Sequence, residues 1–159
     1  MSRRHNAGPG TLTVAGKTDR LAGQFYPNQT HLMPTKTIVK PLKSPAAVGP
    51  YNHAVRVGDL LFCAGQIPIQ PADGTLVTGD IKVQTERVLE NVKAILDDQK
   101  LTFAHVVKST VFLTDLANFA GMNEVYARYF TENFPARSTI QVAGLPKGAS
   151  VEIEVIAHF

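Results

Sequence analysis

The chain has a single cysteine, no tryptophan and no apolar run long enough to span a membrane. One thiol excludes an internal disulfide and suits a reducing compartment. Cys63 lies in the apolar run 60–64, so we expect a buried, unreactive thiol rather than a nucleophile. The sequence also has no apolar stretch of the kind found in secretory signals. Together these absences favour a cytoplasmic protein.

The motifs that usually mark a catalytic centre are also missing. The sequence has no glycine-rich dinucleotide or phosphate-binding loop, no Gly-x-Ser-x-Gly elbow, no Cys-x-x-Cys pair and no His-Glu-x-x-His zinc motif. Its five histidines are scattered and show no metal-ligand spacing. A metal site and a ribonuclease that uses paired histidines are therefore both poorly supported.

Basic residues are concentrated near the N-terminus. Residues 1–43 hold seven of the 16 lysines and arginines but only one of the 13 acidic residues. The rest of the chain is therefore slightly acidic, although the whole sequence carries a formal charge of +3. A surface that follows the phosphates of a nucleic acid needs an excess of positive charge. Neither nucleic acid nor a membrane is an expected partner.

Residues 1–33 differ from the rest in composition. They are rich in glycine, threonine, asparagine and basic residues and show no sustained period, so we expect a disordered N-terminal extension. Their basic character also fits an organelle transit segment, which leaves a mitochondrial location open. Gly8, Pro9 and Gly10 interrupt the amphipathic helix that such a segment needs. Residues 34–159 are long enough to form a single domain with a proper core.

Periodicity and turn residues predict the elements of this domain. Strands are expected over 36–40, 52–57, 60–64, 106–113, 138–143 and 151–157. Helical spacing predicts one helix over 81–98, capped by Asp80, and a second helix capped by Asn118. A strand–helix–strand unit favours a right-handed crossover between parallel strands. The expected fold is α+β, a mixed sheet with two helices packed on one face.

Turns and helix faces are assigned in the same way. Gly58 and Asp59 are expected to form a two-residue hairpin turn, and residues 65–79 a loop. The second helix should direct its aromatic residues inward, as core rather than as a cofactor site. Its expected inner side carries Phe119, Met122, Tyr126, Tyr129 and Phe130.

The two C-terminal strands carry the most unusual side chains. Glu152 and Glu154 lie within a strand, which usually excludes glutamate unless it has a partner or a function. If the two strands pair as a hairpin, Arg137, Thr139 and Gln141 share the face of these carboxylates. Arg137 offers a fork of donors suited to a carboxylate. The pattern fits a small-ligand site, and an interior salt bridge or an oligomer contact fits it as well.

Three other residues are weaker candidates for a binding site. Tyr51 follows Gly49 and Pro50, which stiffen its loop, but ordinary packing explains it equally. Gly65 permits a ligand or another chain to approach the backbone closely. Asn123 lies on the polar side of the second helix, where solvent exposure is the simplest explanation.

Several segments become specific when they are taken together. They are Ser-Pro-Ala-Ala-Val-Gly-Pro-Tyr at 44–51, Ala-Gly-Gln-Ile-Pro at 64–68, Val-Lys-Ser-Thr-Val-Phe-Leu at 107–113, Met-Asn-Glu-Val-Tyr at 122–126, Phe-Pro-Ala-Arg at 134–137 and Glu-Ile-Glu at 152–154. In this order they resemble the RidA/YjgF family of enamine/imine deaminases. The resemblance runs from about residue 35 to the C-terminus and leaves residues 1–33 outside.

This resemblance implies a chorismate-mutase-like fold and a homotrimer with inward-facing sheets and a ligand cleft at each subunit interface. It implies hydrolysis of 2-aminoacrylate, 2-iminopropanoate and 2-iminobutanoate to 2-keto acids and ammonia, without cofactor or metal. Arg137 falls on the family's carboxylate-binding arginine and Glu152 on its water-handling glutamate. Tyr51, Gly65 and Asn123 fall on pocket positions.

Two positions in the expected substrate site depart from the commonest bacterial pattern. Thr139 stands where a cysteine is frequent, and Ala64 where a serine is frequent. Thr139 can act through its backbone N–H, which the change preserves, whereas thiol chemistry is excluded there. Two other functions stay open. One is a non-catalytic binder of keto acids or amino acids that uses Arg137, and the other is an endoribonuclease or translation inhibitor.

Overall fold

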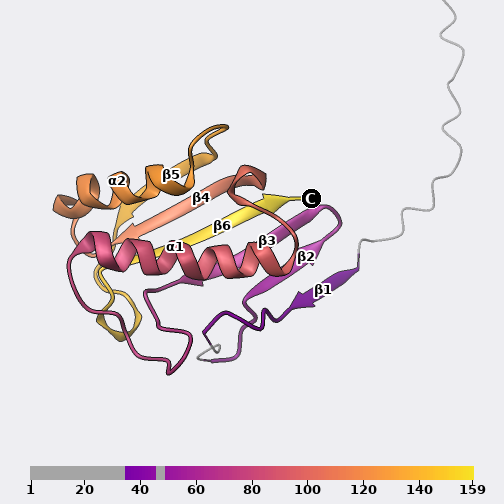
Figure 1. Cartoon of the computed structure of the whole chain (residues 1–159), viewed down its shortest axis with the longest axis horizontal. Helices are drawn as coiled ribbons and strands as arrows, with labels where there is room; N and C mark the ends of the chain where they lie inside the picture. The colour runs from indigo at the N-terminus through magenta and orange to yellow at the C-terminus, as the bar shows by residue number, and fades with distance from the viewer. Residues whose placement is uncertain (1–34, 46–48) are drawn as a thin grey trace, which may run out of the picture. The chain divides into compact units, whose positions relative to one another are not determined.

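The computed structural model describes residues 35–45 and 49–159, which belong to the compact unit Met33–Phe159 (Figure 1). The expected disordered extension, residues 1–33, lies outside the described residues. Within the described part, no helix is long and apolar enough to cross a membrane.

The elements follow the predicted order along the chain. The strands are β1 (Lys36–Val39), β2 (Ala54–Val57), β3 (Leu60–Gln66), β4 (Val106–Leu113), β5 (Ala136–Gln141) and β6 (Val151–His158). The helices are α1 (Ile81–Asp98) and α2 (Phe119–Tyr129), with short 3-10 turns at Phe103–His105, Leu116–Asn118 and Pro146–Gly148. The strands form one sheet in the order β1-β2-β3-β6-β4-β5.

Both helices lie across the same face of this sheet (Figure 1). β4 and β5 run parallel and are joined through α2, as expected of a strand–helix–strand unit. The other neighbouring strands are antiparallel. The predicted α+β fold, a mixed sheet with two helices on one face, is confirmed.

The two faces of the sheet differ in burial. On the helix face, under α1 and α2, Val111, Ile153 and Val155 are almost completely buried. On the opposite side, the open face, Phe62 and Ile140 remain 42% and 47% exposed. An apolar face that stays exposed in one chain is a common contact surface between chains.

The first helix, α1, begins and packs as predicted. The side chain of Asp80 accepts a hydrogen bond from the Val83 backbone N–H at 3.0 Å and caps the first turn. The apolar stripe faces the sheet and is fully buried at Val88, Leu89, Val92, Ile95 and Leu96. Three polar residues, Gln84, Thr85 and Asn91, are buried with this stripe.

The second helix, α2, differs from its prediction at its first turn. Asn118 makes no capping hydrogen bond through its side chain. Asp115 accepts one from the Ala117 N–H at 2.8 Å instead, and this starts the 3-10 turn that leads into α2. Phe119 is 40% exposed rather than part of the core. The remaining predicted inner residues are buried or partly buried, namely Met122, Tyr126, Tyr129 and Phe130.

Strand β3 runs further than predicted. The turn at Gly58 and Asp59 is confirmed, but the strand continues to Gln66, so Gly65 lies in a strand and not in a loop. The pairing register with β6 shifts between Cys63 and Gln66, which marks a bulge. Cys63 itself is buried as predicted, and burial raises the pKa of its thiol to about 12, which keeps it protonated and unreactive.

The expected hairpin between the two C-terminal strands is wrong. β6 lies between β3 and β4, and β5 is an edge strand of the described sheet that pairs with β4. Burial explains this order. Alternate residues of β6 are buried from Val151 to Ala157, whereas β5 has no buried residue. The strand with the apolar stripe takes the central position because it removes more apolar surface from water there.

Candidate functional site

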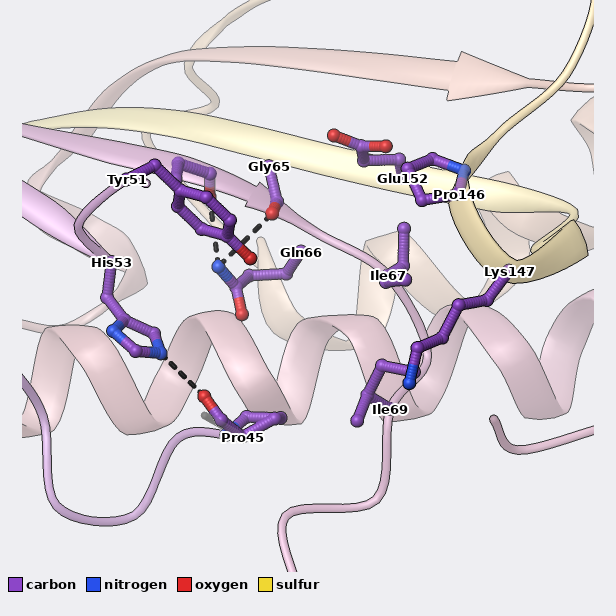
Figure 2. Close-up of a pocket in the computed structure, with 11 residues that line it drawn as sticks. Pro45, Tyr51, His53, Gly65, Gln66, Ile67, Ile69, Pro146, Lys147 and Glu152 are labelled. Carbon is purple, nitrogen blue, oxygen red and sulfur yellow. Dashed lines mark hydrogen bonds between the residues drawn. The ribbon is translucent and has the colours of Figure 1, made fainter. Parts of the chain in front are cut away.

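A cavity of about 360 Å³ opens where β3 ends and β6 begins (Figure 2). Four of the predicted site residues line it: Tyr51, Ala64, Gly65 and Glu152. Its walls are largely apolar and include Pro45, Ile67, Ile69 and Pro146. A concave apolar pocket with a few polar groups is typical of a small-molecule site.

Glu152 packs directly against the backbone of Gly65. A β-carbon added to Gly65 would lie 1.9 Å from Glu152 Oε1 and 2.8 Å from its carboxyl carbon. The Gln66 side chain donates to the carbonyl oxygens of Ala64 and Gly65 at 3.1 and 3.3 Å, which holds the bulge in place (Figure 2). Glycine at position 65 therefore decides where the carboxylate lies, because any larger residue would displace it.

The surroundings of Glu152 favour its neutral form. Burial raises the pKa of this carboxyl group above its ordinary value, and the negative charge of Glu154 raises it further. Within the described residues, no lysine or arginine forms a salt bridge with Glu152. A carboxyl group with a raised pKa exchanges its proton nearer to neutral pH, which is what a general acid–base needs.

Two buried polar residues of α1 tie the helix to segments that lead into this cavity. Asn91 donates from Nδ2 to the carbonyl oxygens of Ile67 and Ile69, at 3.2 and 2.9 Å. Gln84 accepts from the Ser150 N–H at 2.9 Å and donates to Ser150 Oγ at 3.2 Å, just before β6 begins. Neither residue was predicted from the sequence. Their positions in the sequence could have identified them, because a polar residue on the apolar stripe of a helix is buried and needs a hydrogen-bond partner.

Lys147 and His53 also line the cavity and were not predicted. Lys147 Nζ donates to the Gly74 carbonyl oxygen at 3.0 Å, which ties the turn before β6 to the loop after β3. His53 Nε2 lies 2.5 Å from the Pro45 carbonyl oxygen. A lone lysine in a turn and a lone histidine carry no local signal of a site. The described residues contain no group of three or more His, Cys, Asp or Glu side chains placed to hold a metal ion.

Arg137 lies on β5, near the start of this edge strand and two strands away from β6. Its guanidinium carbon is 4.6 Å from the ring centroid of Tyr126 and 5.7 Å from that of Phe119, both on α2. No carboxylate among the described residues forms a salt bridge with it. The charge of Arg137 is therefore supported by aromatic rings and is not neutralised by an ion pair.

Arg137 and Glu152 belong to opposite faces of the sheet. Arg137 pairs in register with Ser109, and Ser109 pairs with Val155, so all three lie on the helix face. Glu152 pairs with Phe112, one position out of phase, on the open face. With about 4.8 Å between strands and about 3.3 Å per residue, the two Cα atoms are roughly 14 Å apart.

The prediction that Arg137, Thr139 and Gln141 share the carboxylate face is therefore wrong, because β4 lies between β5 and β6. The interior salt bridge between Arg137 and Glu152 is not formed either. Thr139 lies on the helix face with Arg137, and Asn123 is exposed on α2, three residues before Tyr126. The seven candidates thus form two groups, four that line the cavity and three that lie on β5 and α2.

The chain is similar to proteins of one family over nearly the whole described domain. Residues 41–159 match the family model described as Endoribonuclease L-PSP. A 2-iminobutanoate/2-iminopropanoate deaminase from Bos taurus is 44% identical over 122 residues, which cover 77% of this chain and 89% of that protein.

Two solved structures share the fold. Escherichia coli TdcF with bound serine is 43% identical, with a TM-score of 0.73 and coverage of 77% of this chain and 98% of that one. RidA from the Antarctic bacterium Psychrobacter is 46% identical, with a TM-score of 0.71 and coverage of 74% and 94%. Sequence and fold therefore agree with the motifs quoted above, and the chain belongs to the RidA/YjgF family.

Proposed function

We propose that this chain hydrolyses 2-imino acids to 2-keto acids and ammonia. The substrates are 2-iminopropanoate, the tautomer of 2-aminoacrylate, and 2-iminobutanoate. The observation that carries the proposal is Glu152, a carboxyl group with a raised pKa that is fixed against Gly65 in a cavity with apolar walls. The name of the bovine relative supports this substrate class.

Glu152 carries the proton of the attacking water through the reaction. It accepts this proton as the water oxygen bonds to the carbon of the protonated imine, which gives a neutral carbinolamine. It then gives the proton to nitrogen and the C–N bond breaks. The hydroxyl proton passes to the departing ammonia, which leaves as ammonium, and the hydroxyl oxygen becomes the keto oxygen. A positioned acid–base of this kind contributes about 10²–10⁴-fold to the rate. The imine carbon is already electrophilic, so no cofactor takes part.

Arg137 binds the carboxylate that stands beside the imine carbon. A guanidinium group meets a carboxylate through two parallel N–H···O bonds, which fixes orientation as well as position. Orientation matters because the water held by Glu152 must meet one face of the imine carbon. Thr139 on the same strand as Arg137, Asn123 on α2, and Tyr51 and Ala64 in the cavity with Glu152 complete the substrate site.

The site is completed between two copies of the chain. Arg137 on the helix face and Glu152 on the open face cannot hold one small substrate within a single sheet. The β5 edge of one copy next to the cavity of a second copy joins the two groups. This contact uses different surfaces on the two partners, and such contacts close into rings. We propose a ring of three, in which the exposed apolar open faces turn inward.

Separate substitutions test the two roles. A dehydratase that uses pyridoxal phosphate supplies the imine, and keto-acid release is followed above the uncatalysed rate. Glu152→Gln should lower turnover by about 10²–10⁴-fold and leave pyruvate binding intact in titration calorimetry. Arg137→Ala should lose both binding and turnover. Arg137→Lys should rescue poorly, because a point charge cannot replace the two-pronged fork.

A binding function without catalysis is the second candidate, and the serine in the TdcF structure favours it. Full turnover in the Glu152→Gln variant would remove the proposed base and support this alternative. RNA incubated with the same variants tests the ribonuclease that the family description names.

A further inference from the structure

Tyr126 and Ser109 form a buried pair of hydroxyl groups next to Arg137. Tyr126, on α2, is 5% exposed, and Ser109, on β4, is completely buried. Their hydroxyl oxygens are 2.7 Å apart. Ser109 is also the direct neighbour of Arg137 in the sheet register. The next residues on this face of β4 are Val111 and Leu113, so a serine here gives up apolar packing.

The ring of Tyr126 is held on two sides. Phe130 stacks on it with the ring centroids 4.2 Å apart and the planes within 13°, and the Arg137 guanidinium carbon is 4.6 Å from the same centroid. One ring face cannot hold two planar groups at these distances, so Phe130 and Arg137 take opposite faces. Phe130 fixes the Tyr126 ring on the face opposite Arg137, and Ser109 fixes its hydroxyl group.

An aromatic face supports a guanidinium group without occupying its hydrogen-bond donors. The five N–H groups of arginine lie in the plane of the guanidinium, whereas a ring attracts the cation through its face. A carboxylate partner would occupy two of these donors, and Arg137 has no such salt bridge among the described residues. Tyr126 therefore supports the charge through its ring face and its hydroxyl group, and no carboxylate of the described residues takes the place of a carboxylate ligand on Arg137.

We propose that Tyr126, fixed by Ser109, is a positioning residue that orients the Arg137 guanidinium before the substrate carboxylate binds. This inference rests on the proposed hydrolysis of imino acids, in which Arg137 is the carboxylate anchor. Preorganisation reduces the entropy lost on binding. Preorganisation of Arg137 acts on binding and not on the proton transfers of Glu152. Loss of Tyr126 should therefore raise KM and change kcat little.

Tyr126→Leu removes the ring face, and Phe130→Leu is the matched control. The control removes the ring behind Tyr126 and does not touch Arg137 directly. Pyruvate is the probe in titration calorimetry, and the coupled assay gives KM and kcat. Tyr126→Leu should raise the Kd for pyruvate and the KM about tenfold, with kcat changed less than about threefold. Phe130→Leu should lower the melting temperature as much and keep Kd within about twofold of wild type.

Tyr126→Phe keeps the ring and removes the hydroxyl group, which is hydrogen-bonded to Ser109 and also interacts with Arg137. We expect the Kd for pyruvate to rise about threefold in this variant. If Tyr126→Leu and Tyr126→Phe both keep the wild-type Kd and KM, Tyr126 is a core residue and the proposal is wrong. A wild-type protein that binds pyruvate without turning over the imine contradicts the deaminase function instead, and the comparison of Kd values still decides the role of Tyr126.

Discussion

Gly65 and Glu152 are both unfavourable in strands, and the contact between them accounts for the presence of each at the candidate site. Glycine weakens a strand because it has no side chain to pack and loses more conformational freedom on folding. Glutamate is uncommon in strands as well. Gly65 and Glu152 occupy β3 and β6 in direct contact, so the missing side chain of one makes room for the carboxylate of the other.

Replacing this glycine tests the contact. Gly65→Ala should lower turnover by about 100-fold, because a displacement of the base by 1 Å or more costs that much. Gly144→Ala is the matched control, since nothing lies within 4 Å of the β-carbon that it adds. Keto-acid release by the two variants is compared at equal protein concentration. Equal turnover in both would mean that the carboxylate position does not depend on Gly65.

The raised pKa of Glu152 predicts the acid side of the pH profile. The base works when ionised, so kcat/KM is lost as the pH falls through a pKa above the ordinary 4.5. Folding favours the protonated form of this group, so its contribution to stability is present below the ordinary pKa and is lost as the pH rises through the folded-state pKa. Glu154→Gln removes one cause of the shift and should move the acid limb to lower pH. An unmoved limb would exclude Glu154 as a cause.

Elements with local signals were predicted closely from the sequence. The structure places α1 at Ile81–Asp98 with Asp80 as its cap, as expected, because an amphipathic period and an N-cap residue are both properties of neighbouring residues. β4 was also predicted to its ends, since its apolar run is bounded by turn and loop residues.

Pairing between strands was harder to predict, because it is decided far along the chain. The short loop between β5 and β6 favours a hairpin, but β6 pairs with β3 and β4, which lie 38 or more residues earlier in sequence. This single difference moved Arg137 to the opposite face from Glu152. Four of the candidate residues line one cavity, as a shared site requires, while the arrangement of Arg137 and Glu152 within one chain was predicted wrongly.

The contact between α1 and the loop after β3 gives a prediction at this scale. Asn91→Leu leaves the carbonyl oxygens of Ile67 and Ile69 without their donor, and each buried unpaired group costs about 1–3 kcal/mol. We expect a lower melting temperature and a raised KM, because these residues form a wall of the cavity. Lys93→Ala, on the exposed side of α1, should change neither. A wild-type KM in the Asn91→Leu variant would separate this wall from substrate binding.

In the whole molecule, the two groups of candidate residues lie too far apart to contact one small substrate within a single chain. Glu152 and Gly65 lie at the junction of β3 and β6, and Arg137 lies at the β5 edge on the other face. The open face meanwhile keeps Phe62 and Ile140 substantially exposed. An assembly that covers this face and brings a second copy's β5 edge to the cavity resolves both features, and light scattering should show three chains per particle. A stable monomer at micromolar concentration would exclude it.

Mixed assemblies test whether the site is shared between copies. Arg137→Ala and Glu152→Gln should each be nearly inactive alone. Co-expressed in equal amounts, they should recover up to about a quarter of wild-type turnover, because random rings place an intact arginine beside an intact glutamate at that fraction of interfaces. Arg137→Ala co-expressed with the double variant is the control and should stay inactive. A mixture of the two single variants that also stays inactive would mean that each copy carries a complete site, contrary to the placement of Arg137 and Glu152 on opposite faces of the sheet.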